Sequence, residues 1–232
     1  MLKLLFVAAL ALLAAPANAA ERSFTVTDFD KVQVDGAFDV TLVTGRAPRA
    51  VASGDADALN ALDVEVQGRL LKIRRNLSAW GGYPGARTGA VTIALATHDL
   101  RNASVRGAGR LAIDRVEAMR FEVSLFGGGK IEIGDVSADR FDLGLVGSGK
   151  IKLAGRVKSF RGTVEGAADL EAGALIADDA QVNAGSAGTV TLSVRRAATV
   201  NATGAGDVEI LGTPACKVTT RGFGQVVCGK GQ

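Results

Sequence analysis

The sequence predicts an all-β fold, a right-handed single-stranded parallel β-helix with coils of about 18–20 residues. The stretches FEVSLFGGGKIEI at 121–133 and FDLGLVGSGKIKL at 141–153 contain the three observations that predict it. A glycine-rich turn recurs, apolar residues alternate on both sides of that turn, and like residues return at like positions. Alternation with a period of two is typical of half-buried strands, and a repeat of this length is typical of a stacked solenoid.

Glycine-rich turns recur seven times between residues 101 and 228. We call the second small residue of each turn its turn position. The turn positions are Gly109, Gly129, Gly149, Ala168, Gly188, Gly206 and Gly224. Consecutive turn positions are 20, 20, 19, 20, 18 and 18 residues apart, so the repeat length is nearly constant. A meander of hairpins would not need such constancy, whereas a stack of coils does.

Each coil is predicted to hold two strands and a third side. In the coil around Gly129 the alternating apolar residues are Val123, Leu125, Ile131 and Ile133, and Val136 marks the third side. Eight residues before their turn positions lie Phe121, Phe141 and Phe160. We expect these rings to stack on successive coils, ~4.8 Å apart. The right hand follows because crossovers between parallel strands are nearly always right-handed.

Residues 20–100 repeat less regularly than residues 101–228. The expected elements there are strand pairs in 29–45 and 62–73, a strand at 91–95, a short helical turn within 54–62 and a loop at 79–89. Turn signals such as Asp35-Gly36 separate the strands of each pair. We expect residues 20–232 to form a single β-solenoid domain.

The first 19 residues are typical of a cleaved secretory signal peptide. Lys3 precedes an apolar run from Leu4 to Ala15, and Ala17-Asn18-Ala19 supplies a small-x-small cleavage site. The run is too short to span a membrane as a helix, and no transmembrane segment is predicted in the mature chain. The sequence therefore predicts an exported protein, periplasmic or extracellular.

Composition excludes some classes of partner. The formal net charge is +3, and removing the signal peptide with its one lysine leaves about +2. Aromatic residues make up 5% of the chain, too few for a base-stacking surface. Nucleic acid is therefore not an expected partner.

The order of these segments resembles a bacterial family, the putative auto-transporter adhesin head domain or GIN domain. The resemblance is carried by FDKVQVDGAFDVTLVTG at 29–45, LDVEVQGRLLKI at 62–73, VTIALATHDLRNASVRGAG at 91–109 and the G-x-G coils. It covers about residues 28–228. It implies a secreted or periplasmic parallel β-helix, and it brings no catalytic motif that these residues would carry.

Cys216 and Cys228 are the only cysteines in the chain. Counted from the turn positions, they occupy the places of Phe141 and Leu153 in earlier coils, so both should point inward in the last coil. In an oxidising compartment we expect a disulfide between them, stabilising by roughly 2–3 kcal/mol for this separation. The alternative is two buried free thiols.

Catalytic and metal chemistry have few candidate residues. His98, the only histidine, lies in the loop ATHDL and is more typical of a solvated residue than of a catalytic triad. Glu122 and Asp142 lie on neighbouring coils and could approach the ~5 Å separation of a retaining glycosidase. The alternative is an exposed ladder whose charge Arg161 compensates. No metal or cofactor site is predicted.

Three sets of residues are candidate binding surfaces. Arg110, Lys130 and Lys150, one residue after their turn positions, form a basic ladder that either binds an acidic glycan or is a solvated corner. Trp80 and Tyr83 share a glycine-flanked loop and either bind a partner or fold over the coils as a lid. The third set is a polar column five residues before the turn positions: Ser104, Ser124, Gly144, Thr163, Asn183, Asn201 and Thr219.

The function that these observations favour is binding or adhesion at the cell envelope by a non-enzymatic β-helix with a polar face. A glycan or an envelope protein is the expected partner. A carbohydrate-active enzyme using Glu122 and Asp142 and a purely structural envelope component are the alternatives. The sequence leaves the oligomeric state open.

Overall fold

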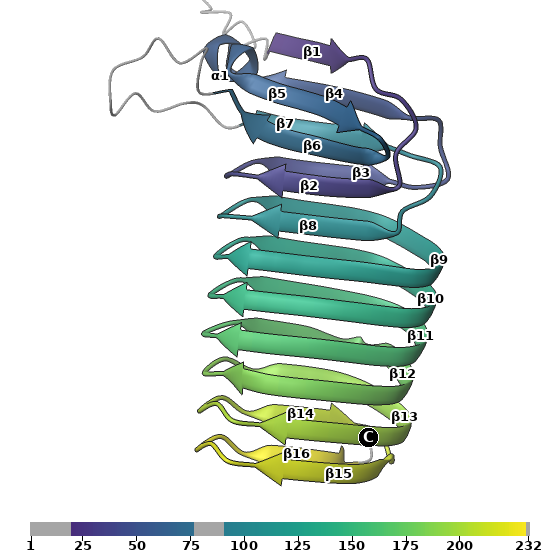
Figure 1. Ribbon diagram of the computed structural model, residues 1–232, viewed down its shortest axis with the longest axis vertical. Helices are drawn as coiled ribbons and strands as arrows, with labels where there is room; N and C mark the ends of the chain where they lie inside the picture. The colour runs from purple at the N-terminus through teal and green to yellow at the C-terminus, as the bar shows by residue number, and fades with distance from the viewer. Residues whose placement is uncertain (1–19, 77–90, 231–232) are drawn as a thin grey trace, which may run out of the picture.

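The computed structural model describes residues 20–76 and 91–230. The predicted signal peptide at 1–19 and the loop with Trp80 and Tyr83 lie outside these residues. Within them the predicted parallel β-helix is confirmed (Figure 1).

Long strands that wrap around the molecule form the regular coils. These strands are β9 (Arg110–Gly127), β10 (Lys130–Gly147), β11 (Lys150–Gly166), β12 (Asp169–Ser186) and β13 (Val190–Ala202). Three shorter strands complete the C-terminal end: β14 (Val208–Leu211), β15 (Ala215–Thr220) and β16 (Val226–Lys230). Every pairing from β9 to β16 is parallel, as stacking of coils requires.

The N-terminal third combines parallel coils with antiparallel strands. Its elements are β1 (Ala20–Phe24), β2 (Lys31–Asp35), β3 (Asp39–Val43), β4 (Arg49–Gly54), α1 (Ala56–Asn60), β5 (Leu62–Gln67), β6 (Leu70–Arg75), β7 (Val91–Ala96) and β8 (Asn102–Arg106). β2 and β3 lie between β6 and β7 on one side and β8 and β9 on the other, all in parallel. The chain therefore passes over its own first coil between β7 and β8 (Figure 1).

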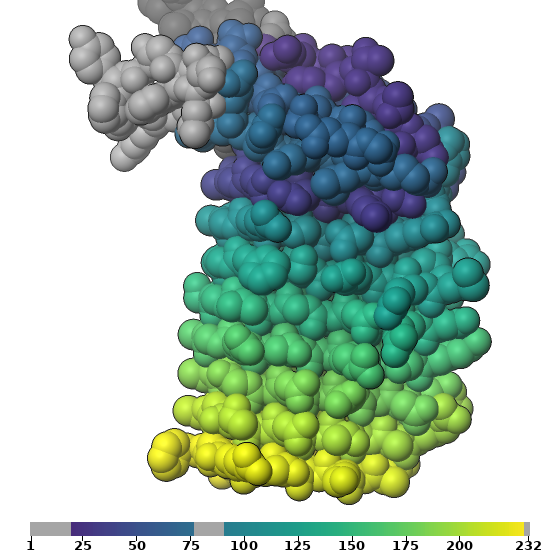
Figure 2. All heavy atoms as spheres, in the orientation of Figure 1, coloured from purple at the N-terminus to yellow at the C-terminus, as the bar shows by residue number. Residues whose placement is uncertain are grey.

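The strand pairs expected at 29–45 and 62–73, the strand at 91–95 and the helical turn within 54–62 are all present. β1 and β4 were not predicted. They form an antiparallel set with β7, and β5 pairs antiparallel with β6. Figure 2 shows the result on the surface: below β8 the coils form layers in chain order, whereas the purple and blue N-terminal segments alternate.

Side chains stack into in-register columns inside the coils. Phe121, Phe141 and Phe160 pair in register and are fully buried, with neighbouring ring centroids 5.7 Å apart. The same column continues through Ala180 and Ala198 to Cys216. The predicted phenylalanine column is thus confirmed, although the rings lie 5.7 Å apart and the Phe121 and Phe141 rings are tilted by 54°.

Glycine at the turn positions permits the close approach of coils. A Cβ atom on Gly129 would lie 2.5 Å from the carbonyl oxygen of Gly109, which is closer than carbon and oxygen can approach. Gly127 adds a second requirement, because its φ of +117° strains any residue with a side chain.

The third side of the solenoid absorbs the differences in coil length. Phe121 lies eight positions after Ile113, but Cys216 lies only six positions after Ile210. The register shifts between β10 and β11, β11 and β12, and β12 and β13 all fall on this side. The two sheets stay in register while the third side narrows.

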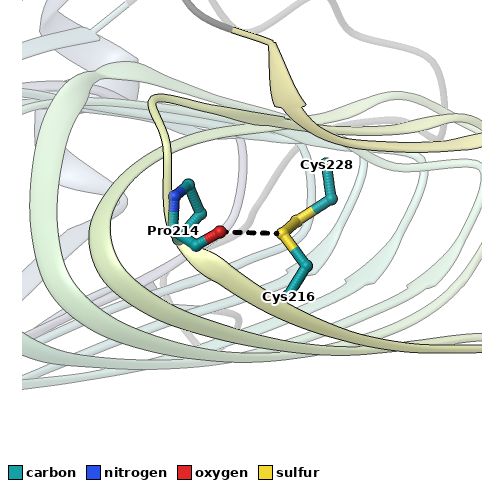
Figure 3. The surroundings of a disulfide bond; sticks show 3 residues. All are labelled: Pro214, Cys216 and Cys228. Atoms are coloured by element: carbon teal, nitrogen blue, oxygen red, sulfur yellow. Dashed lines mark hydrogen bonds between the residues drawn. A yellow bond between two sulfur atoms is a disulfide. The ribbon is translucent and has the colours of Figure 1, made fainter.

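The predicted disulfide joins Cys216 of β15 to Cys228 of β16 across the interior of the last coil (Figure 3). Cys216 lies beneath Ala198 and Cys228 beneath Ile210, the predicted columns. Cys216 is nevertheless exposed and Cys228 half-buried, because no described coil follows. The carbonyl oxygen of Pro214 lies 3.5 Å from Cys216 Sγ, a packing contact because a disulfide sulfur has no hydrogen to donate.

Candidate binding faces

The polar column is the most regular feature of the outer surface. Its members pair in register from Gln33 of β2 through Ser104, Ser124, Gly144, Thr163, Asn183 and Asn201 to Thr219 of β15. The Ser124 hydroxyl donates to the Ser104 hydroxyl at 3.0 Å, and the Asn201 amide donates to Asn183 Oδ1 at 3.0 Å. These bonds orient the side chains along the stack. Ser104 is buried, whereas Ser124, Asn183 and Asn201 are half-buried and keep further donors and acceptors at the surface.

Larger side chains stand on both sides of the polar column near β9 and β10. Glu122 and Asp142 lie two residues before it, and Phe126 and Val146 lie two residues after it. Phe126 is 45% exposed and Val146 is 36% exposed. Between them, a Cβ atom on Gly144 would meet no atom within 4 Å. The surface at Gly144 is therefore open, with the carboxylates on one side and the apolar side chains on the other. We call this open surface at Gly144 the open floor.

Phe126 is a surface residue that the sequence reasoning missed, since no aromatic platform was expected near the carboxylate pair. The signal was present, because Phe126 lies one position after the inward-facing Leu125 and alternation places it outward. It gives the polar column an exposed aromatic ring on the sheet that carries Glu122 and Asp142.

Glu122 and Asp142 are register neighbours on adjacent coils, as predicted. Arg120 Nε lies 3.2 Å from Asp142 Oδ2, and Arg140 Nε lies 4.0 Å from the same oxygen. Arg161, which was expected to compensate this charge, is in backbone register with Asp142, but its Nε donates to Gln181 Oε1 at 3.2 Å, so Arg120 and Arg140 take that role. Asp142 is thus held by cations, the arrangement of a charge-compensated ladder, which was the alternative to a glycosidase pair.

The basic ladder is in register, but its arginine and both of its lysines are bound to carboxylates. Arg110 and Lys130 both contact Glu132, at 2.5 and 2.7 Å, and Lys150 contacts Glu171 at 2.6 Å. Hydrogen bonding from Lys130, supported by Arg110, lowers the pKa of Glu132. The hydrogen bond to Glu171 raises the pKa of Lys150. This geometry favours the solvated-corner interpretation of the ladder over a free basic edge.

A groove along the third side was not predicted. It consists of three hollows of about 650, 430 and 330 Å³ that share lining residues: Glu117 joins the first two, and Ile176 and Arg195 join the last two. Two ion pairs lie within it, Lys158 with Asp139 at 2.7 Å and Arg195 with Asp178 at 3.5 Å. The shortening of the third side was the sequence signal that could have indicated it.

His98 lies in a charged cluster where the chain crosses its first coil. Its Nδ1 is 3.1 Å from Asp28 Oδ1, and both side chains are exposed. This contact, followed by the charge of Arg69, lowers the pKa of Asp28. Arg69 also bonds Asp30 at 2.9 Å and Asp99 at 3.4 Å. The cluster ties the crossover to β6, which is a structural role.

We also searched the described residues for metal-binding clusters and for membrane-spanning helices. Residues 20–76 and 91–230 contain no group of three or more acidic, histidine or cysteine side chains that could hold a metal ion. Within the same ranges no helix is long and apolar enough to cross a membrane.

Several solved bacterial structures share this fold over nearly the whole chain. A putative adhesin from Bacteroides fragilis superposes with a TM-score of 0.79 at 18% identity, over 90% of this chain and 96% of that one. A putative lipid binding protein from Parabacteroides distasonis gives 0.68 at 21% identity, over 91% and 98%. A putative adhesin from Parabacteroides merdae gives 0.67 at 14% identity, over 91% and 97%.

These likenesses establish the fold. A comparison with curated proteins found no match. The model of one family, described as "putative auto-transporter adhesin, head GIN domain", matches residues 28–214, from just before β2 to the residue before β15. The chain belongs to this family of head GIN domains.

Proposed function

We propose that this protein is an exported, non-enzymatic, adhesin-like protein that binds an extended glycan along its polar column. The observation that carries the proposal is the in-register column of small residues from Ser124 of β9 to Thr219 of β15, which is polar on every coil except at Gly144. Apart from the coil of Gly144, successive coils offer a hydroxyl or a side-chain amide every ~4.8 Å. A flat row of this kind suits a polymer with repeating hydroxyl groups better than a compact ligand.

The surroundings of Gly144 supply the second element of the proposed site. Sugar rings present hydroxyl groups at their edges and apolar C–H groups on their faces. The open floor at Gly144 would admit a ring, Phe126 and Val146 would contact its apolar face, and Ser124 and Thr163 would bond its hydroxyls. The contribution of Trp80 and Tyr83 to binding stays a prediction.

Export is supported by two independent features. The sequence of residues 1–19 is typical of a cleaved secretory signal. The disulfide between Cys216 and Cys228 is typical of proteins outside the reducing cytoplasm. Cell fractionation and protease accessibility in intact cells would distinguish a periplasmic from a cell-surface location.

The test is a glycan-array screen of residues 20–232, followed by titration of each positive glycan against two tryptophan variants. In Gly144→Trp the added Cβ would meet no atom within 4 Å and the indole would occupy the open floor, so we expect binding to be abolished and the unfolding curve to stay unchanged. Thr41→Trp adds the same side chain at an exposed position on the opposite sheet and should bind as the wild type does. Equal binding by both variants would refute the polar column as the site.

The non-enzymatic part of the proposal has its own test. Incubation with a panel of polysaccharides should release no reducing sugar. Release that disappears in Glu122→Gln would contradict the proposal and favour the glycosidase alternative. Charge reversal at Lys130 and Lys150 should leave binding of neutral glycans unchanged, because both lysines are occupied by carboxylates.

A further inference from the structure

The coil that contains β15 and β16 has an open edge among the described residues. β15 pairs only with β13, and β16 pairs only with β14, so one side of each strand has no strand beside it among the described residues. Such an edge presents a row of backbone N–H and C=O groups to an incoming strand. The edge lies beyond the residues that the family model matches, which end at 214.

The interior of the solenoid is also uncovered at this edge. Val200 of β13 is fully buried, whereas Val218, its neighbour in β15, is 41% exposed. Ala198 and Ala202 are likewise buried, whereas Cys216 and Thr220 beneath them are exposed. An added strand would cover these side chains as each coil covers the coil before it.

The charge of this edge is uniform. After Glu209 the sequence contains Lys217, Arg221 and Lys230 and no acidic residue. Lys217 and Arg221 are exposed and make no ion pair within the described ranges, unlike Lys150 and Arg196, which contact carboxylates on neighbouring coils. Strand alternation places Lys217 and Thr219 of β15 on the outward side, and Arg221 follows one residue after the strand ends.

The edge is held in position before any partner arrives. The disulfide fixes β15 to β16, and the turn between them bonds to the preceding coil, with the amide of Arg221 donating to Ala202 at 2.8 Å and that of Gln225 to Asp207 Oδ1 at 2.9 Å. A preorganised edge loses little conformational entropy when a strand adds to it.

We propose that the open edge of β15 is a docking site for an extended acidic peptide of a partner protein, which adds as a further strand. Backbone hydrogen bonds would supply most of the affinity, as in other cases of β-strand addition. Alternate apolar side chains of the peptide would cover Val218 and Thr220. The intervening carboxylates would pair with Lys217 and Arg221. A second copy of this chain fits less well, because it would bring the same cations against one another.

The probe is a blocked, fluorescein-labelled six-residue peptide of alternating glutamate and valine, titrated by anisotropy against the disulfide-bonded protein at low salt. The variant Lys217→Glu/Arg221→Glu should bind it at least tenfold more weakly. The control Arg46→Glu/Arg156→Glu changes the net charge equally at two exposed arginines away from the edge and should bind within twofold of wild type. Both variants alter solvated side chains, and circular dichroism verifies their fold.

Two further measurements separate strand addition from simple charge attraction. A peptide with proline at its central positions keeps the charge but lacks N–H donors, and it should not bind. Hydrogen exchange should slow at the amides of β15 when the first peptide binds. Binding of the proline peptide, unchanged exchange in β15, or equal weakening in both charge variants would overturn the proposal.

Other occupants would give different results. A concentration-dependent dimer in sedimentation that Lys217→Glu/Arg221→Glu makes monomeric, without peptide binding by the wild type, would assign the edge to a second copy. Co-sedimentation with phosphatidylglycerol vesicles that the peptide does not reduce would assign it to an anionic membrane. Either result would overturn the peptide proposal.

Discussion

The two ends of the solenoid are finished in different ways. At the N-terminal end, β1, β4 and β5 run antiparallel to their neighbours and α1 packs beside them. Arg22 of β1 donates to the carbonyl oxygen of Leu59 in α1 at 3.1 Å and lies over the Phe24 ring. At the C-terminal end the coils continue in parallel to β16, and a disulfide closes the last one.

The difference shows what stacking alone can and cannot do. A parallel coil buries its interior only when another coil lies on each side. Antiparallel strands and a helix change the geometry at the first end and cover the interior there. The second end keeps its geometry, leaves Val218 exposed and gains a covalent link instead. We therefore expect the turn glycines, the disulfide and the helix cap to contribute different amounts to the free energy of unfolding, the disulfide at the C-terminal end and the helix cap at the N-terminal end.

The largest effect is expected for a turn glycine in the coils. A Cβ atom on Gly206 would lie 1.8 Å from the carbonyl oxygen of Gly188, so Gly206→Ala must push two coils apart. We expect a loss of about 3 kcal/mol or more in the free energy of unfolding. Chemical denaturation followed by circular dichroism measures it.

The matched control is Gly68→Ala in the turn between β5 and β6. Gly68 has a φ of +62°, and a Cβ atom there would meet no atom within 4 Å. The cost of this substitution is therefore conformational only, about 1 kcal/mol. Equal losses in the two variants would show that the coils do not depend on close approach at the turn positions.

The disulfide is expected to have the next largest effect. Cys216→Ser/Cys228→Ser removes a link across 12 residues, and we expect about 2–3 kcal/mol less stability. Hydrogen exchange should accelerate first in β15 and β16, because the disulfide joins those two strands to each other. If hydrogen exchange accelerated first in β1 and β4, loss of the disulfide would destabilise the N-terminal end, which contradicts this prediction.

A smaller effect is expected for the helix cap at the N-terminal end. Asp55 Oδ1 accepts hydrogen bonds from the amides of Asp57 and Ala58, at 3.0 and 3.2 Å. Asp55→Ala should cost about 1 kcal/mol, and Asp55→Asn, which keeps an acceptor, should cost much less. Thermal unfolding of both variants makes the comparison. An Asn variant as unstable as the Ala variant would assign the effect to charge.

The coils were predictable from sequence because their signals are local. Period-two alternation, a nearly constant repeat and glycine at each turn fix the register, and the register fixes the phenylalanine column, the polar column and the cysteine pair. The position of β2 and β3 between later strands was not predictable in this way. It depends on pairing between segments far apart in sequence, such as Lys31 with both Leu70 and Asn102.

For the candidate sites, the sequence predicted which side chains align on successive coils but not which side chains contact one another. The register of the coils predicted that Arg110, Lys130 and Lys150 form one ladder. It did not predict the contacts of Glu132 with Arg110 and Lys130, because these contacts depend on the conformations of long side chains that extend from one column to the next. The groove was not predicted, because it depends on how many residues each coil has along the third side and not on which residue types they are. β4 was missed because RAVASG carries no aromatic residue and its partner β7 lies about forty residues later.

The smallest effect is expected for the ion pairs on the coils. The pKa of Glu132 is lowered in the folded protein, so its contribution to stability is present above the ordinary carboxyl pKa of about 4.3 and is lost as pH falls through the lower folded value. Glu132→Gln should therefore unfold more easily than wild type near neutral pH, and the two curves should converge once the pH falls below the lowered folded-state pKa of Glu132. The difference should shrink in high salt, because all three partners are partly exposed. A difference between the two proteins that persists at low pH would mean that Glu132 stabilises the coils through packing and not through its charge.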